Sequence, residues 1–152
     1  MGLAAAFQKE LDEMVELARR VKRNGQPALR DPILRQNLAQ CYIDILALRC
    51  NGYRNVTRLM KGQVPGSEGS IGKLLWSELH QRMGELAMEI QGPYHQVIRG
   101  SQRAIDNGKW QYIFLRSKGN TIERGTTEIQ LNIIGERVLG LPKDAARAMV
   151  KK

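Results

Sequence analysis

Apolar residues recur every three or four positions along three long segments of this 152-residue chain, and this spacing constrains its fold more than any other feature. Residues at that spacing lie on one face of an α-helix, so each segment predicts a helix with a single apolar stripe. The stripes are Leu3, Phe7, Leu11, Met14, Ala18 and Val21; Leu34, Leu38, Cys41, Ile45 and Leu48, extended by Tyr53, Val56 and Met60; and Ile71, Leu75, Leu79, Met83, Leu86 and Ile90.

Cap and turn residues set the expected ends of these helices. The first helix has no capping residue and looks cut rather than begun, and an Asn-Gly pair at 24–25 breaks it. Asp31 followed by Pro32 predicts the start of a second helix of about 30 residues. Ser67 or Ser70 is a candidate cap for the third helix, which ends at Gly92 and the proline after it.

Two shorter helices are expected after an irregular connection over residues 94–107. One covers about 109–119, and the other covers about 127–139 before Gly140 and Pro142. No segment shows a useful β period. The sequence therefore predicts an all-α fold, an antiparallel up-down four-helix bundle with an additional short helix, as a single domain over residues 1–152. Such long apolar stripes also predict an oligomer or further domains.

The formal net charge of +9 raises the question of a nucleic-acid partner. Most basic residues stand apart, and the runs at 19–23 and 151–152 contain no aromatic residues. We therefore expect a solvated basic surface and no nucleic-acid partner; a basic helical nucleic-acid binder remains an alternative that charge alone favours. No apolar run approaches the roughly 20 residues of a membrane span, so no membrane association is expected.

The two cysteines predict a reducing compartment. Cys41 and Cys50 are nine residues apart within one expected helix, which places them on opposite faces, too far apart to form a disulfide with each other. Unpaired thiols favour a cytoplasmic location. The two histidines, His80 and His95, have no metal-ligand spacing around them, so no metal site is predicted.

A glycine turn at Gly125 opens the last expected helix, whose first turn carries two threonines and unpaired backbone N–H groups. Such a helix end can hold a phosphate, because the free donors and the helix dipole favour negative charge. The alternative is capping without a ligand, since Thr127 and Gln130 have the spacing of a capping box.

Residues 120–130, which read N-T-I-E-R-G-T-T-E-I-Q, continue into N-I-I-G-E-R-V-L-G-L-P at 132–142. This stretch resembles the last core helix of the acyl-CoA dehydrogenase family, and residues 69–78 resemble the third bundle helix of its actinobacterial-type members. The order of helices also matches, so the resemblance to the C-terminal helical bundle of this family covers nearly the whole chain.

The resemblance implies a flavoprotein oxidoreductase that uses FAD to introduce an α,β double bond into acyl-CoA thioesters. Members also contain an N-terminal helical domain and a middle β domain, which are absent from these 152 residues. The chain is therefore expected to contribute to FAD binding and to homo-oligomerisation in an intact enzyme, and to be inactive alone. The implied partners are an acyl-CoA substrate and an electron acceptor of the electron-transfer flavoprotein type.

The resemblance also assigns residues. Gly125, Thr126 and Glu128 correspond to the family's cofactor-binding positions. Many members carry the catalytic glutamate directly before the glycine, where this chain has Arg124, which cannot act as a base. The side chain of Glu123 is expected to point elsewhere, and other members carry the base on a helix segment that would precede residue 1. No catalytic residue is therefore predicted in this chain.

Two further flavin motifs of the family are degraded in this sequence. The arginine-x-x-phenylalanine-glycine motif is V-K-R-N-G at 21–25, and the glutamine-x-x-glycine-glycine motif is E-I-Q-G-P at 89–93. These departures and Arg124 keep a second interpretation open, a non-catalytic helical oligomerisation or interaction module derived from the same family.

Overall fold

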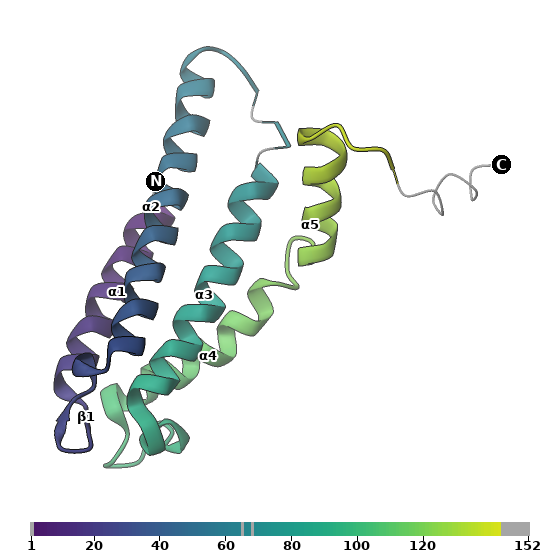
Figure 1. Cartoon of the computed structure of the whole chain (residues 1–152). Helices are drawn as coiled ribbons and strands as arrows, with labels where there is room; N and C mark the ends of the chain where they lie inside the picture. The colour runs from purple at the N-terminus through teal and green to yellow at the C-terminus, as the bar shows by residue number, and fades with distance from the viewer. Residues whose placement is uncertain (1, 65, 68, 144–152) are drawn as a thin grey trace.

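The computed structural model describes residues 2–64, 66, 67 and 69–143, and it confirms the all-α prediction. The first four helices alternate in direction along the chain, and α5 continues upward from the end of α4 (Figure 1). The helices are α1 (Gly2–Arg20), α2 (Pro32–Met60), α3 (Gly69–Gln91), α4 (Lys109–Asn120) and α5 (Thr127–Ile133). Within the described part of the chain, no helix has the length and apolar character needed to cross a membrane.

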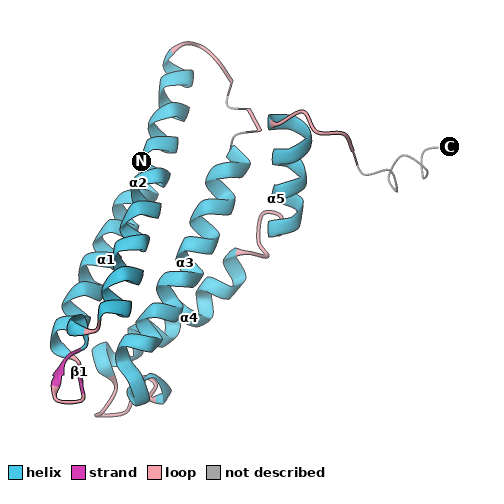
Figure 2. Ribbon diagram, in the orientation of Figure 1, coloured by secondary structure: helices cyan, strands magenta, loops and turns pink. Residues whose placement is uncertain are grey.

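A small β-hairpin between α1 and α2 was not predicted. Strands β1 (Lys22–Arg23) and β2 (Gln26–Pro27) pair antiparallel (Figure 2). The predicted break becomes the hairpin turn, where Asn24 has φ 51° and Gly25 has φ 79°. Both residues therefore adopt the left-handed conformation that a two-residue type I′ turn requires. Strands of two residues are too short to show a β period in the sequence.

The predicted cap of α2 is confirmed. The Asp31 carboxylate accepts hydrogen bonds from the backbone N–H of Ile33 at 2.9 Å and of Leu34 at 3.4 Å, and Pro32 occupies the first helical position. A short 3-10 turn, η1 (Ala28–Arg30), leads into it. Ser70 lies inside α3, so the alternative of a cap at Ser70 is wrong, and the residue directly before α3 lies outside the described residues.

Helix α3 is central to the core, because it contacts each of the other four helices. The three predicted stripes supply most of the buried apolar side chains, although Leu3 is 45% exposed; the others are Ala4, Leu17, Ala28, Ala87 and Trp110. The predicted extension of the second stripe is not buried, since no described residue of α2 beyond Asn51 is buried. Tyr53 is 50% exposed and Met60 is 83% exposed, so the described part of the chain leaves this end of α2 largely uncovered.

Helices α3 and α4 approach each other closely at Gly84. A Cβ added to Gly84 would lie 2.9 Å from the Cα of Phe114 and 3.2 Å from the Ser117 hydroxyl oxygen. The Ser117 hydroxyl is buried and donates to the Phe114 carbonyl at 2.7 Å. Only a glycine allows the two backbones to pack at this distance.

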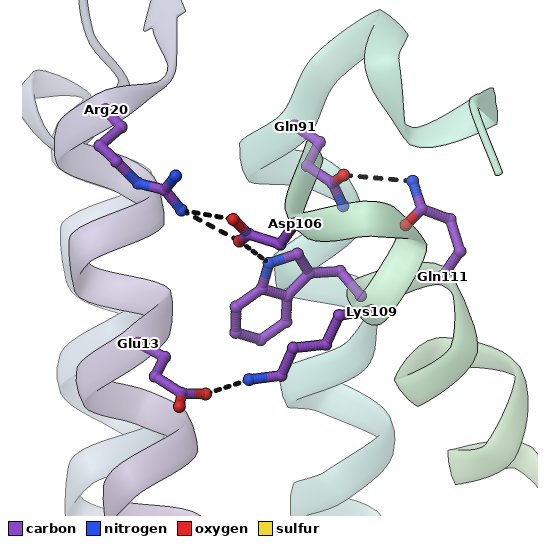
Figure 3. Close-up of polar contacts among 7 residues, drawn as sticks. Glu13, Arg20, Gln91, Asp106, Lys109 and Gln111 are labelled. Atoms are coloured by element: carbon purple, nitrogen blue, oxygen red, sulfur yellow. Dashed lines mark hydrogen bonds and ion pairs between the residues drawn. The ribbon is translucent and has the colours of Figure 1, made fainter. Parts of the chain in front are cut away.

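The connection between α3 and α4 contains two 3-10 turns, η2 (Gly92–Gln96) and η3 (Ile105–Gly108), and is tied to α1. The Asp106 carboxylate accepts from Arg20 of α1 at 2.9 and 3.0 Å and from the Trp110 indole N–H at 2.7 Å (Figure 3). These bonds hold Asp106 at a φ of 47°, and two more left-handed residues follow it. The start of α4 is therefore fixed against α1.

The last helix is shorter than predicted and ends differently. An α-helical segment, α5, covers Thr127–Ile133, and the predicted remainder is a π-helical turn over Ile134–Val138. The N–H of Leu139 donates to the carbonyl of Ile134 at 3.0 Å, which is the wider spacing of a π turn. Gly140 follows with φ 69° and ends the helix, as predicted.

The contact at Gly84 predicts opposite effects for two glycine substitutions. Gly84→Ala should lower the free energy of unfolding by about 1–3 kcal/mol, because the new methyl group must push α4 away from α3. Gly52→Ala, inside α2, should raise it by about 0.5–1 kcal/mol, because no described atom beyond the helix's own neighbouring backbone lies within 4 Å of the added Cβ. Urea unfolding followed by circular dichroism measures both, and equal effects would contradict the close contact.

Candidate functional site

The turn between α4 and α5 brings the predicted cofactor-binding residues together. Arg124 has φ 56° and Gly125 has φ 94°, and Thr126 then returns to an extended conformation as the N-cap of α5. The Thr126 hydroxyl oxygen accepts from the N–H of Ile129 at 3.4 Å. The cap is therefore Thr126 and not Thr127, and the predicted capping box at Thr127 is wrong by one residue.

Gln130 fixes the turn from inside. It is only 6% exposed, and its amide donates to the Arg124 carbonyl at 2.9 Å. A Cβ at position 125 would lie 2.7 Å from the Gln130 amide nitrogen. Gly125 is thus required twice, by its positive φ and by the side chain packed beneath it. The spacing of glycine, threonine and glutamine in the motif has a structural basis in this turn.

Glu128 lies in the exposed first turn of α5. Its pKa is lowered because the carboxylate accepts hydrogen bonds from its own backbone N–H and from the Thr126 side chain. Gly125, Thr126 and Glu128 therefore share one small surface. A carboxylate at this helix end already interacts favourably with the helix dipole and repels an added phosphate. The geometry suits contact with neutral polar groups of a cofactor better than contact with its phosphates.

A cleft of about 360 Å³ adjoins this turn. Arg124 lines it from the turn, Leu3 from α1, Asn51 from α2, and Lys73 and Trp76 from α3. The Lys73 ammonium also donates to the carbonyl of Asn120 at 3.0 Å, which holds the end of α4 against α3. The residue at the position that the resemblance assigns to a catalytic glutamate is therefore a cation facing a cleft.

Glu123, the carboxylate nearest to that position, is paired elsewhere. Both of its carboxylate oxygens lie 3.1 Å from the Arg116 guanidinium of α4, and Glu123 does not line the cleft. Its side chain is therefore held by α4. The structure places no carboxylate among the described lining residues that could act as a base there.

Glu10 is a titratable group that the sequence reasoning missed. Burial raises its pKa to about 7, against a smaller lowering by the charge of Lys109. Its buried Oε1 has no hydrogen-bond partner among the described residues and lies 3.7 Å from Nε2 of His80, whose pKa is lowered by burial and by Arg116. The sequence could have indicated that Glu10 is buried, because it lies three residues after Phe7 and four before Met14, on the apolar face of α1.

The other candidate groups add no further site. Within the described residues, no three histidine, cysteine or acidic side chains are placed to hold a metal ion. Both cysteines are free, Cys41 buried and Cys50 exposed. The turn at 124–126 and the cleft beside it are the features to compare with known proteins.

The sequence model of the acyl-CoA dehydrogenase C-terminal domain matches residues 1–139. The chain belongs to the acyl-CoA dehydrogenase family. It is 37% identical over 147 residues to the acyl-CoA dehydrogenase IpdE1 of Mycolicibacterium smegmatis, a match that covers 95% of this chain and 33% of that protein. The chain thus spans about a third of the length of this acyl-CoA dehydrogenase.

Solved structures share the fold. The ChsE4-ChsE5 complex from Mycobacterium tuberculosis superposes with a TM-score of 0.78 at 25% identity, over 93% of this chain and 37% of the matched chain. An FAD complex of PigA has a TM-score of 0.74 at 21% identity, over 91% of this chain and 34% of the other. The helical arrangement is therefore that of acyl-CoA dehydrogenase C-terminal domains.

The buried carboxyl of Glu10 predicts a pH-dependent stability. Because its folded pKa of about 7 lies above the ordinary 4.5, the folded state binds more protons between these values, and its stability falls as pH rises through 7. Glu10→Gln lacks this ionisation. When the pH is raised from about 5 to 8, the unfolding free energy of the wild-type protein should fall by on the order of 2 kcal/mol more than that of Glu10→Gln.

Urea unfolding at several pH values measures this difference. Glu89→Gln, at an exposed position of α3, is the matched control and should follow the wild-type pH dependence. A parallel pH dependence for Glu10→Gln and the wild-type protein would contradict the buried, protonated carboxyl.

Proposed function

We propose that this chain forms the C-terminal domain of a flavin-dependent acyl-CoA dehydrogenase, which oxidises the α,β bond of acyl-CoA thioesters, and that it is inactive alone. The observation that carries the proposal is the turn at 124–126, which presents the family's glycine-threonine pair beside a cleft. In that enzyme α1–α4 act as an up-down four-helix bundle. The missing helical and β domains come from outside these 152 residues.

The proposed role at the cofactor is positioning. The backbone around Gly125, the Thr126 hydroxyl and the Glu128 carboxylate form a surface that fits neutral polar groups of FAD. When bound, the flavin supplies the hydride acceptor, and the protein orients the substrate and the ring. The chain's own contribution is then a rigid contact, held by Gln130 beneath the turn.

The catalytic base comes from outside this chain in our proposal. An arginine at position 124 cannot act as a base, and Glu123 is occupied by Arg116. The resemblance of the fold to one chain of the ChsE4-ChsE5 complex supports a second, non-identical chain as the source. A homo-oligomer is the other arrangement, in which the uncovered end of α2 contributes to the interface.

The remaining proposed properties follow from the family and the thiols. An acyl-CoA is the substrate of the assembled enzyme, and an electron-transfer flavoprotein-type protein is its electron acceptor. The free Cys41 and Cys50 thiols support a cytoplasmic location.

A second candidate function is a helical interaction module without chemistry. Arg124 in place of a base and the degraded motifs at 21–25 and 89–93 favour it. The two functions differ in one observable property, because only the first requires a flavin in the native assembly.

Substitution of Thr126 tests the flavin contact. The chain, affinity-purified from its own cells with its natural partners, should show flavin absorption bands and oxidise acyl-CoA. Thr126→Val should reduce the flavin content at least about tenfold, as expected for a lost hydrogen bond together with a loosened turn. Thr127→Val, one residue away and outside the cap, should retain it.

Two controls separate the interpretations. Thr126→Ser keeps the hydroxyl and should keep the flavin. If Thr126→Val lost its flavin only because the chain unfolded, its partner chains would be lost as well. A colourless oligomer from the wild-type protein would overturn the proposed function and support the interaction module.

A further inference from the structure

The cleft beside the turn is lined by cations from three separate parts of the chain. Arg49 comes from α2, Lys73 from α3 and Arg124 from the turn before α5, and the described lining residues include no carboxylate. The cleft encloses about 360 Å³, enough for a small organic molecule. Its charge therefore favours an anionic occupant.

Lys73 is the strongest evidence for a built site. Lys73 is only 9% exposed, and the Asn120 carbonyl is the single hydrogen-bond partner of its ammonium among the described residues. An ammonium has three donors and is costly to bury without a counter-ion. A carboxylate in the cleft would offset that cost and accept from the unused donors.

The two arginines have donors to spare as well. Arg124 forms no ion pair with any described residue, and Arg49 has an uncharged partner, the Gln8 side-chain oxygen, at 3.5 Å. A guanidinium presents a planar fork of N–H groups that matches the two oxygens of a carboxylate. Arg116, by contrast, is already paired with the Glu123 carboxylate.

Amides and apolar groups complete the lining. Asn51 is 8% exposed, and a Cβ on Gly72 would lie 3.1 Å from its amide nitrogen, so this glycine makes room for the amide between α2 and α3. Trp76 and Leu48 supply apolar surface next to these polar groups. The cleft therefore combines a cationic region with an apolar one, which suits a molecule with a charged head and an apolar body.

We propose that this cleft binds the carboxylate of an amphipathic organic acid, with Lys73 and Arg124 as its principal contacts. The carboxylate accepts from the Lys73 ammonium and the Arg124 guanidinium, and the apolar body lies against Trp76 and Leu48. This proposal goes beyond the flavin contact, since it needs neither FAD nor the missing domains.

Titration calorimetry with octanoate, and with octanamide as its uncharged counterpart, tests this site on the full chain. Octanoate should bind and octanamide should bind at least about tenfold more weakly, because only the carboxylate forms charge-assisted hydrogen bonds. Lys73→Met keeps the apolar stem and should weaken octanoate binding by at least about tenfold. Lys22→Met, on the exposed hairpin, removes the same charge and should leave the affinity unchanged.

Arg124→Gln keeps the proposal testable if Lys73→Met fails to fold, because Arg124 is an exposed turn residue. It should weaken octanoate binding several-fold, and amide NMR shifts on octanoate addition should map to residues 48–55, 72–76 and 124. Equal affinity for octanoate and octanamide, or an unchanged affinity in Arg124→Gln, would overturn the proposal. The flavin content of the native assembly is a separate readout, so failure here leaves the proposed function standing.

Discussion

The close packing of α3 against α4 at Gly84 positions the turn at 124–126 and the cleft beside it. Helix α3 contacts α1, α2, α4 and α5, and its backbone meets that of α4 without an intervening side chain at Phe114. That contact brings the carbonyl of Asn120, at the end of α4, within 3.0 Å of the Lys73 ammonium. The turn that follows is then fixed by Gln130, and Arg124 faces the cleft.

The cleft beside the turn at 124–126 has no catalytic base among its described lining residues. The position that the family resemblance assigns to a base carries Arg124, and the polar side chains among the described lining residues of the cleft are cations and amides, with Trp76. Glu10, the carboxyl among the described residues whose pKa is raised to about 7, lies on α1 beside His80 of α3 and does not line the cleft. In our proposals the chain therefore supplies a cofactor contact and an anion-binding surface, and the catalytic base comes from outside these 152 residues.

The sequence predicted what repeats along the chain and missed what depends on distant contacts. Apolar spacing gave the long helices, and the Asp31-Pro32 pair gave the start of α2, because both are local properties. The capping residue was misplaced by one position, because the conformation of Gly125 and the buried Gln130 decide between two adjacent threonines. The cleft could not be predicted, since Arg49, Lys73 and Arg124 meet only through the packing of α2, α3 and the turn.

A structure of the native assembly, purified with its partners and solved by electron cryomicroscopy, tests the central claim most directly. Our account predicts a flavin in contact with the Thr126 side chain and a catalytic carboxylate supplied from outside this chain. An assembly in which the turn at 124–126 packs against protein, with no flavin beside it, would contradict the account.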